Sequence, residues 1–278
     1  MFDLIKICLG CSCMLSQHSL NFYRDWRENY QWPPDQSPRT SEEKIAELLE
    51  ESRASLCNLT VLGKPLLQKI HHWKTQNRAR TTEKYAEILR GNEEIIPSLQ
   101  KLLPVSSSLS PDFVKKLIDA LRIGYANLPV CSAQASFLCN RALPILDRYV
   151  AQFFSHTVSP AILSFDKCNM SAVLRDISTL GFVIEDDGTH KCIPRLAVYQ
   201  PENYARNRDV FACELLPELN RIADELNDSN VTYQDIYGKP KGFSSVDVEM
   251  AVFAFGTQNR RYFECWYREQ PTSLGLQQ

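Results

Sequence analysis

Apolar positions recur at helical spacing along most of the chain, and this pattern predicts a mainly α-helical protein. After Thr40, the residues Ile45, Leu48 and Leu49 place an apolar stripe along one face of the first clear helix. We expect further helices over residues 66–75, 83–90, 95–103, 113–124, 132–141, 147–154, 170–180, 204–226 and 246–255.

Short polar motifs indicate where some of these helices begin and end. Thr40 and Glu43 form a capping-box pattern, which predicts that a helix begins at Thr40. Asn127-Leu128-Pro129 is a helix-stopping sequence. We therefore expect the helix before it to end there, and the next helix to begin a few residues later.

Two segments depart from the helical pattern. Residues 182–199 alternate between apolar and polar types around Asp187-Gly188, a strong turn dipeptide, and this predicts a small β-hairpin. Residues 1–38 show no clear periodicity and end in a proline-rich stretch. We expect that first segment to be irregular.

The composition is that of an ordinary globular protein. Of the 278 residues, 44% are hydrophobic and 23% are charged. The apolar start is interrupted by Asp3 and Lys6, which makes it a poor secretory signal, and we predict no membrane span. The ten cysteines are scattered and fit no disulfide framework. We therefore expect a cytoplasmic or nuclear protein with reduced thiols and no membrane partner.

The overall charge does not favour nucleic acid. The formal net charge is −2 and the pI is about 6.2, so a contact with DNA would require a local basic patch. The densest run of basic residues surrounds Trp73 and comprises His71, His72, Lys74, Arg78, Arg80 and Lys84. Such a run can hold phosphates while an aromatic ring stacks on a base. The alternative is a solvated helix end whose tryptophan belongs to the core.

Asp147 stands at the start of a helix, shortly after the turn at Asn127-Leu128-Pro129. A helix, a tight turn and a second helix expose backbone N–H groups that can hold a phosphate. A carboxylate at the start of the following helix would lie close to that bound group. Asp147 is therefore either a catalytic carboxylate or an N-cap that the helix needs for its own backbone.

The residues around this acid resemble the helix-hairpin-helix DNA glycosylases. ANLPVCSAQA (126–135) is similar to the family hairpin LPGVGxKTA, and PILDRYV (144–150) is similar to its P-x-L-D-x-x-V segment. The resemblance implies that Asp147 stabilises the positive charge that develops on the sugar as a flipped base departs. We expect DNA contacts from the hairpin residues Val130, Cys131, Ser132 and Gln134, and from His72, Trp73, Lys74, Arg78 and Arg80 of the basic run.

The chain departs from the family at three positions of the hairpin. Pro129 and Cys131 stand where the family has glycines, so the permissive backbone and one N–H donor are lost. Ala133 stands where some members carry a lysine that forms a covalent imine. The resemblance therefore implies monofunctional base removal without lyase chemistry.

A weaker similarity covers about two thirds of the chain. It joins HHWKTQNRAR (71–80), VCSAQASFL (130–138), PILD and SVDVEMAVFAFG (245–256) to a poorly characterised branch of glycosylase-like proteins, whose motifs follow the order W-K-x-x-R, V-G-V-P-x-A-S, D and D-V-D-x-A-L-W. Within the last motif, we expect Asp247 and Glu249 to be capping and surface residues.

The resemblance implies a two-lobed helical fold with a small β-hairpin insertion. The expected units are an irregular segment (1–38), a helical lobe formed by both ends of the chain (39–90 and 200–270), a central helix-hairpin-helix lobe (91–160), an insertion with the β-hairpin (161–199) and a tail (271–278). The cleft between the lobes would contain Asp147.

Other kinds of site are not expected. Cys8, Cys11, Cys13 and His18 are of types that bind zinc, but they are crowded together and no second pair follows at the usual distance. We therefore expect no metal. There is also no phosphate loop of the Walker type, so we expect no nucleotide or other cofactor.

Two hypotheses of function follow. The first is a DNA glycosylase-like protein that removes a base with Asp147 as its single carboxylate. The alternative is a non-catalytic protein of the same fold that acts as a protein-interaction or scaffold module. The acidic pI and the altered hairpin residues favour the alternative.

Overall fold

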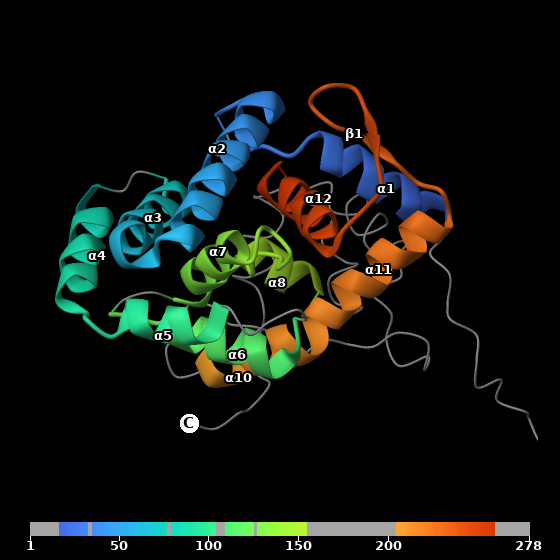
Figure 1. Cartoon of the computed structure of the whole chain (residues 1–278). Coiled ribbons are helices and arrows are strands. Elements are labelled where there is room, and N and C mark those ends of the chain that lie inside the picture. Colours follow the sequence, from blue (N-terminus) through green and yellow to red (C-terminus); the bar gives the residue numbers. More distant parts are fainter. Residues whose placement is uncertain are drawn as a thin grey trace, which may run out of the picture.

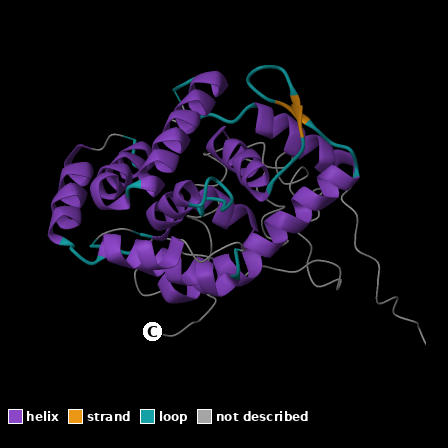
Figure 2. Cartoon of the chain, in the orientation of Figure 1, coloured by secondary structure: helices purple, strands orange, loops and turns teal. Residues whose placement is uncertain are grey.

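The computed structural model describes residues 17–32, 35–76, 79–103, 109–124, 127–154 and 204–258 (Figure 1). This part of the chain is mainly helical and contains one small two-stranded sheet (Figure 2), which confirms the predicted fold class. The helix predicted at 170–180 and the hairpin predicted at 182–199 lie outside the described residues. No helix within the described ranges combines the length and the apolar character that a membrane crossing requires.

The first part of the chain forms α1 (Gln17–Glu28), α2 (Pro38–Cys57), α3 (Leu59–Lys74), α4 (Ala79–Gly91), α5 (Ile95–Leu102), α6 (Pro111–Ala120), α7 (Leu128–Leu138) and α8 (Arg148–Phe154). The last part forms α10 (Tyr204–Val210), the π-helical segment η5 (Phe211–Leu215), α11 (Leu216–Asp228), β1 (Tyr233–Gln234), β2 (Pro240–Lys241) and α12 (Ser245–Gln258).

Helix α1 lies within the segment that we expected to be irregular, so that expectation is wrong for Gln17–Glu28. Its buried residues Leu20, Tyr23 and Arg27 follow a helical spacing, but the aromatic and polar neighbours obscure the pattern. Phe22 packs edge-on against Phe255 of α12, with ring centroids 5.2 Å apart. Packing against α12, more than intrinsic propensity, holds this helix.

Several helices begin earlier than predicted, and in α2 and α7 a proline lies in the first turn. Helix α2 starts at Pro38, and the hydroxyl of Ser37 accepts from the N–H of Thr40, so the predicted start at Thr40 is wrong. Helix α7 starts at Leu128, with Asn127 as its N-cap. Pro129 lies in its first turn, where a missing N–H costs nothing, so this proline begins a helix and does not end one.

The run from α10 through η5 to α11 is a continuous helix with one π-helical turn. Pro217 has no N–H to donate to the carbonyl four residues earlier. Just before it, the N–H of Leu216 donates to the carbonyl of Phe211, five residues back. The widened turn therefore accommodates the proline without ending the helix.

The strands β1 and β2 pair antiparallel, with Tyr233 opposite Lys241. The Asp235 carboxylate closes the connecting turn by accepting from the N–H groups of Tyr237 and Lys239, each at 2.9 Å. Gly238 has a φ of +71°, a left-handed conformation that favours glycine. No pattern in the sequence led us to expect this hairpin.

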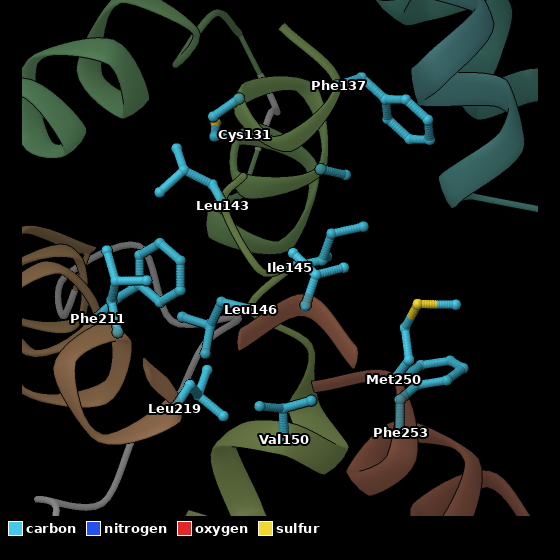
Figure 3. Close-up of a cluster of buried hydrophobic side chains, with 14 of the residues drawn as sticks. Cys131, Phe137, Leu143, Ile145, Leu146, Val150, Phe211, Leu219, Met250 and Phe253 are labelled. Carbon is cyan, nitrogen blue, oxygen red and sulfur yellow. The ribbon is translucent and has the colours of Figure 1, made fainter. Parts of the chain in front are cut away.

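Two buried helices organise the core. Every residue of α7 is buried, and so is nearly all of α12, so these two helices have neighbours on all sides. Helices α2, α3 and α6 pack against α7, whereas α1, α8 and α11 pack against α12. Helices α2 and α3, from residues 39–90, therefore contact the central segment. Leu146 and Val150 lie between Phe211 and Leu219 on one side and Met250 and Phe253 on the other (Figure 3).

The approach of α8 to α12 depends on a glycine. A Cβ atom at Gly256 would lie 2.5 Å from the Cβ of Tyr149, which is closer than real contacts allow. Gly256→Ala should therefore destabilise the protein by about 1–3 kcal/mol, the usual cost of overpacking. Chemical denaturation of the purified variant measures this cost.

Gly91→Ala is the matched control, because nothing lies within 4 Å of a Cβ at that position. It should be neutral or slightly stabilising. Equal stabilities of the two variants would contradict the close packing of α8 on α12.

Candidate functional site

Asp147 caps the N-terminus of α8. Its Oδ1 accepts from the N–H of Tyr149 at 3.0 Å, and its carbonyl oxygen accepts from the N–H of Ala151 at 2.8 Å. The residue is 6% exposed, so the carboxylate lies inside the protein. The helix-cap interpretation of Asp147 is confirmed by these bonds.

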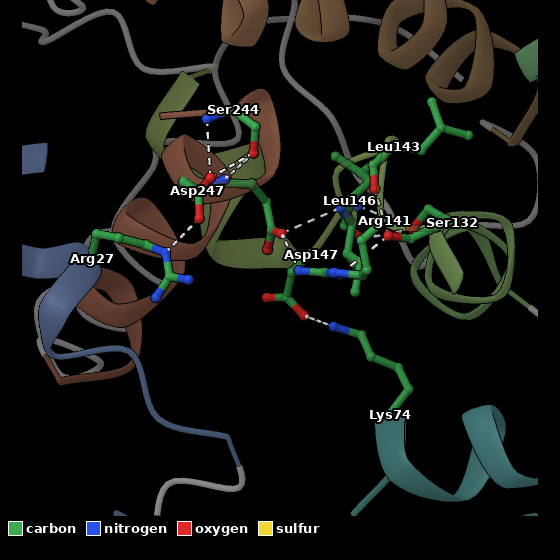
Figure 4. Close-up of polar contacts among 12 residues, drawn as sticks. Arg27, Lys74, Ser132, Arg141, Leu143, Leu146, Asp147, Ser244 and Asp247 are labelled. Carbon is green, nitrogen blue, oxygen red and sulfur yellow. Dashed lines mark hydrogen bonds and ion pairs between the residues drawn. The ribbon is translucent and has the colours of Figure 1, made fainter. Parts of the chain in front are cut away.

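The second carboxylate oxygen binds Lys74, which lies in the last turn of α3. The Lys74 Nζ donates to Asp147 Oδ2 at 3.0 Å, and each of the two side chains is 8% exposed (Figure 4). Lys74 was expected to contact DNA as part of the basic run. In the folded chain the Lys74 ammonium group is paired with Asp147, 73 positions away in the sequence. A DNA contact from Lys74 is at odds with this pairing.

Glu249 is the next carboxyl group of this cluster and comes from α12. It is 3% exposed, so the expectation of a surface residue is wrong. Burial raises the pKa of Glu249 to about 7, although the positive charges of Arg141 and Lys74 oppose this rise. Its Oε2 has only long contacts, at 3.4 Å to the N–H of Ile145 and at 3.9 Å to the Arg141 guanidinium.

The loop that carries Asp147 is held from two sides. From α7, the Ser132 hydroxyl accepts from the N–H of Leu146 at 3.0 Å, and the Ser136 hydroxyl donates to the carbonyl of Leu143. From α12, Glu249 holds the N–H of Ile145. These contacts fix the backbone just before Asp147, so the carboxylate is rigidly positioned.

The segments that carried the weaker sequence similarity therefore meet around one acid. Lys74 follows Trp73 in the first of the four motifs, Asp147 ends the PILD motif, and Glu249 belongs to the last. The contacts between Lys74 and Asp147 and between Ile145 and Glu249 join these three motifs.

The hairpin residues expected to contact DNA are buried. Val130, Cys131, Ser132 and Gln134 are at most 6% exposed. Two N–H groups in the first turn of α7 are also occupied, because Asn127 accepts from Val130 through its side chain and from Cys131 through its carbonyl. A phosphate on these residues, as the sequence predicted, is at odds with this burial.

The polar side chains of the hairpin bond within the protein. Gln134 donates to the hydroxyl of Tyr85 at 2.6 Å and to the carbonyl of Leu67 at 3.1 Å. The Cys131 thiol donates to the carbonyl of Leu121, and burial raises its pKa to about 12. These residues join α7 to α3, α4 and α6.

The residues of the basic run differ in how deeply they are buried. Trp73 is 8% exposed and packs edge-on against Phe137, as the core interpretation predicted. His71 is buried and stacks on Tyr85, and burial lowers its pKa to about 4, so it is neutral at pH 7. His72 is exposed. Arg78 and the side chain of Arg80 lie outside the described residues.

A second ionic cluster was not predicted. The Arg27 Nε donates to Asp247 Oδ1 at 2.8 Å, and another nitrogen of the same guanidinium lies 2.6 Å from Glu42. Asp247 also accepts from the hydroxyl and the N–H of Ser244, so the predicted capping role is confirmed, but the residue is buried and not on the surface. Although burial opposes ionisation, the neighbouring Arg27 keeps the pKa of Asp247 below its ordinary value.

The described residues contain no cluster of three or more side chains suited to a metal ion. Within them, Cys57, Cys131, Cys139 and Cys213 are thiols and not disulfides. The zinc ligands considered at residues 8–13 lie outside the described residues, as does the side chain of His18. No protein-family model, no curated protein and no solved structure matches the chain.

Glu249 gives the protein a specific pH dependence. A carboxyl group whose pKa is raised on folding contributes stability below its ordinary pKa of 4.5, and this contribution is lost as the pH rises to about 7. The stability of Glu249→Gln relative to the wild type should therefore increase from pH 4.5 to pH 7, by about 3 kcal/mol in total, and should change little above pH 7.

Thermal unfolding between pH 4.5 and pH 8 measures this difference. Glu50→Gln is a suitable control, because Glu50 lies on the exposed face of α2. An advantage of Glu249→Gln that does not change with pH would contradict the raised pKa.

Proposed function

We propose that this chain is a non-catalytic protein of the helix-hairpin-helix glycosylase type, used as a protein-interaction or scaffold module. The observation that carries the proposal is the internal use of Asp147, which caps α8 with one oxygen and binds Lys74 with the other.

Electrostatics support this assignment of Asp147. A carboxylate that assists base departure must face the cation that forms on the sugar. Here an ammonium group lies 3.0 Å from the carboxylate, so a sugar cation would meet a neutral pair. Both side chains are 8% exposed, which leaves little carboxylate surface for a substrate.

The hairpin supports the same conclusion. Phosphate binding at a helix N-terminus needs N–H groups that are free and accessible. In α7 Pro129 has no N–H, the N–H groups of Val130 and Cys131 are bonded to Asn127, and the side chains that follow are buried. The net charge of −2 adds no general attraction for nucleic acid.

An excision assay tests the proposal directly. Purified full-length protein is incubated with duplexes that carry deaminated, oxidised or alkylated bases, and abasic product is measured. We expect no product above that formed in buffer, and no duplex binding with the steep salt dependence of phosphate contacts. Excision that disappears in Asp147→Asn would overturn the proposal.

The structural role of Asp147 has a separate test. Asparagine also caps helices, so Asp147→Asn keeps the cap but leaves the buried Lys74 ammonium without its counter-ion. The variant should lose about 3–5 kcal/mol of stability, as broken buried ion pairs do. Adding Lys74→Met to Asp147→Asn should recover part of this loss. Chemical denaturation measures all three proteins.

An exposed ion pair between α3 and α2 provides the control. Lys69 lies 2.7 Å from Glu51, with exposures of 57% and 42%, so Glu51→Gln should cost at most about 1 kcal/mol. A loss for Asp147→Asn no greater than that of Glu51→Gln would argue against a structural ion pair.

Base excision is the second candidate, and one observation favours it. Three of the four motifs that resemble the glycosylase-like branch meet around Asp147, and burial raises the pKa of the neighbouring Glu249 to about 7. Strongly perturbed carboxyl groups are concentrated in functional sites. This candidate requires Lys74 to leave Asp147 when DNA binds, and the excision assay distinguishes the two.

A further inference from the structure

Lys74 lies between two aromatic rings as well as beside a carboxylate. Its Nζ lies 5.4 Å from the ring centroid of Trp32 and 5.4 Å from that of Phe253. The two rings stand nearly perpendicular, at 79°, with centroids 5.1 Å apart. The ammonium group is thus enclosed by two ring faces and by Asp147.

The walls of this enclosure are held by contacts that do not involve Lys74. The indole N–H of Trp32 donates to the carbonyl of Trp73 at 3.2 Å, and the backbone N–H of Trp32 donates to the Ser41 hydroxyl at 2.8 Å. Phe253 packs edge-on against Tyr149, with centroids 6.0 Å apart. Asp147 is fixed by the N–H of Tyr149.

We infer that Asp147, Trp32 and Phe253 form a binding site for an alkylammonium group, and that Lys74 fills this site as an internal ligand. The rings attract a cation through their negative faces, and the carboxylate accepts its hydrogen bond. A metal ion would need several oxygen ligands, whereas an alkylammonium group needs one acceptor and apolar walls. The inference does not depend on the proposed function, because it rests on this geometry alone.

The site should therefore accept a primary amine when Lys74 is shortened. Lys74→Ala removes the side chain from Cγ to Nζ, and n-propylammonium has the same atoms. We expect n-propylammonium at millimolar concentrations to raise the melting temperature of Lys74→Ala by several degrees. It should have little effect on the wild type, where the site is already filled.

Three controls separate a cation site from a simple cavity. The neutral n-propanol should stabilise Lys74→Ala much less than the amine does. Lys69→Ala, which removes an exposed lysine of the same helix, should not respond to the amine. Lys74→Ala combined with Asp147→Asn should lose the response. Equal effects of amine and alcohol, or an equal response after Asp147→Asn, would overturn the inference.

A double-mutant cycle keeps the inference testable if Lys74→Ala does not fold. Lys74→Met retains the length of the side chain without its charge, and Trp32→Leu removes one ring. The melting temperature should fall less for Lys74→Met in the Trp32→Leu background than in the wild type, because the cation–ring attraction is already lost. Identical decreases in both backgrounds would show that the ring does not bind the ammonium group, and the inference would fail.

Discussion

The central interaction of this fold is the buried ion pair of Asp147 and Lys74. The cost of removing each charge from water must be offset by interactions inside the protein. Removing either charge from water costs several kcal/mol, so neither group is stable there without the other. The pair joins the end of α3 to the start of α8, two elements separated by 73 positions. Its geometry therefore requires the end of α3 and the start of α8 to meet, and Phe253 of α12 covers the Lys74 ammonium group there.

The other buried polar groups near this ion pair hold Asp147 in position. Serines of α7 hold the loop before Asp147, and Glu249 holds it from α12. Buried networks of this kind specify one arrangement more strictly than apolar packing does, because each misplaced partner leaves an unsatisfied group. Three of the four motifs on which the sequence resemblance rests contribute residues to this network, so these residues have a structural role.

Periodicity was sufficient to predict most helices but not the partners of their charged residues. The stripe of Ile45 and Leu48 is visible locally, and both residues are buried as expected. Arg27 and Asp247 lie 220 positions apart, and no local pattern indicates that two charged residues pair over such a distance. Glu249 was predicted to be a surface residue because its contact, the N–H of Ile145, also lies far away in the sequence. The prediction for the start of α7 was wrong because a proline can mark either the end or the beginning of a helix. The N-cap at Asn127 shows that Pro129 marks a beginning.

The π-helical turn η5 has a consequence for the shape of the molecule. An additional residue in one turn rotates everything that follows by roughly 100° about the helix axis. Helix α10 therefore faces α6 and α7, while α11, on the same continuous rod, faces α12 (Figure 1). One helix thereby connects both groups of helices, and deleting a single residue from this turn would misalign one group with respect to the other.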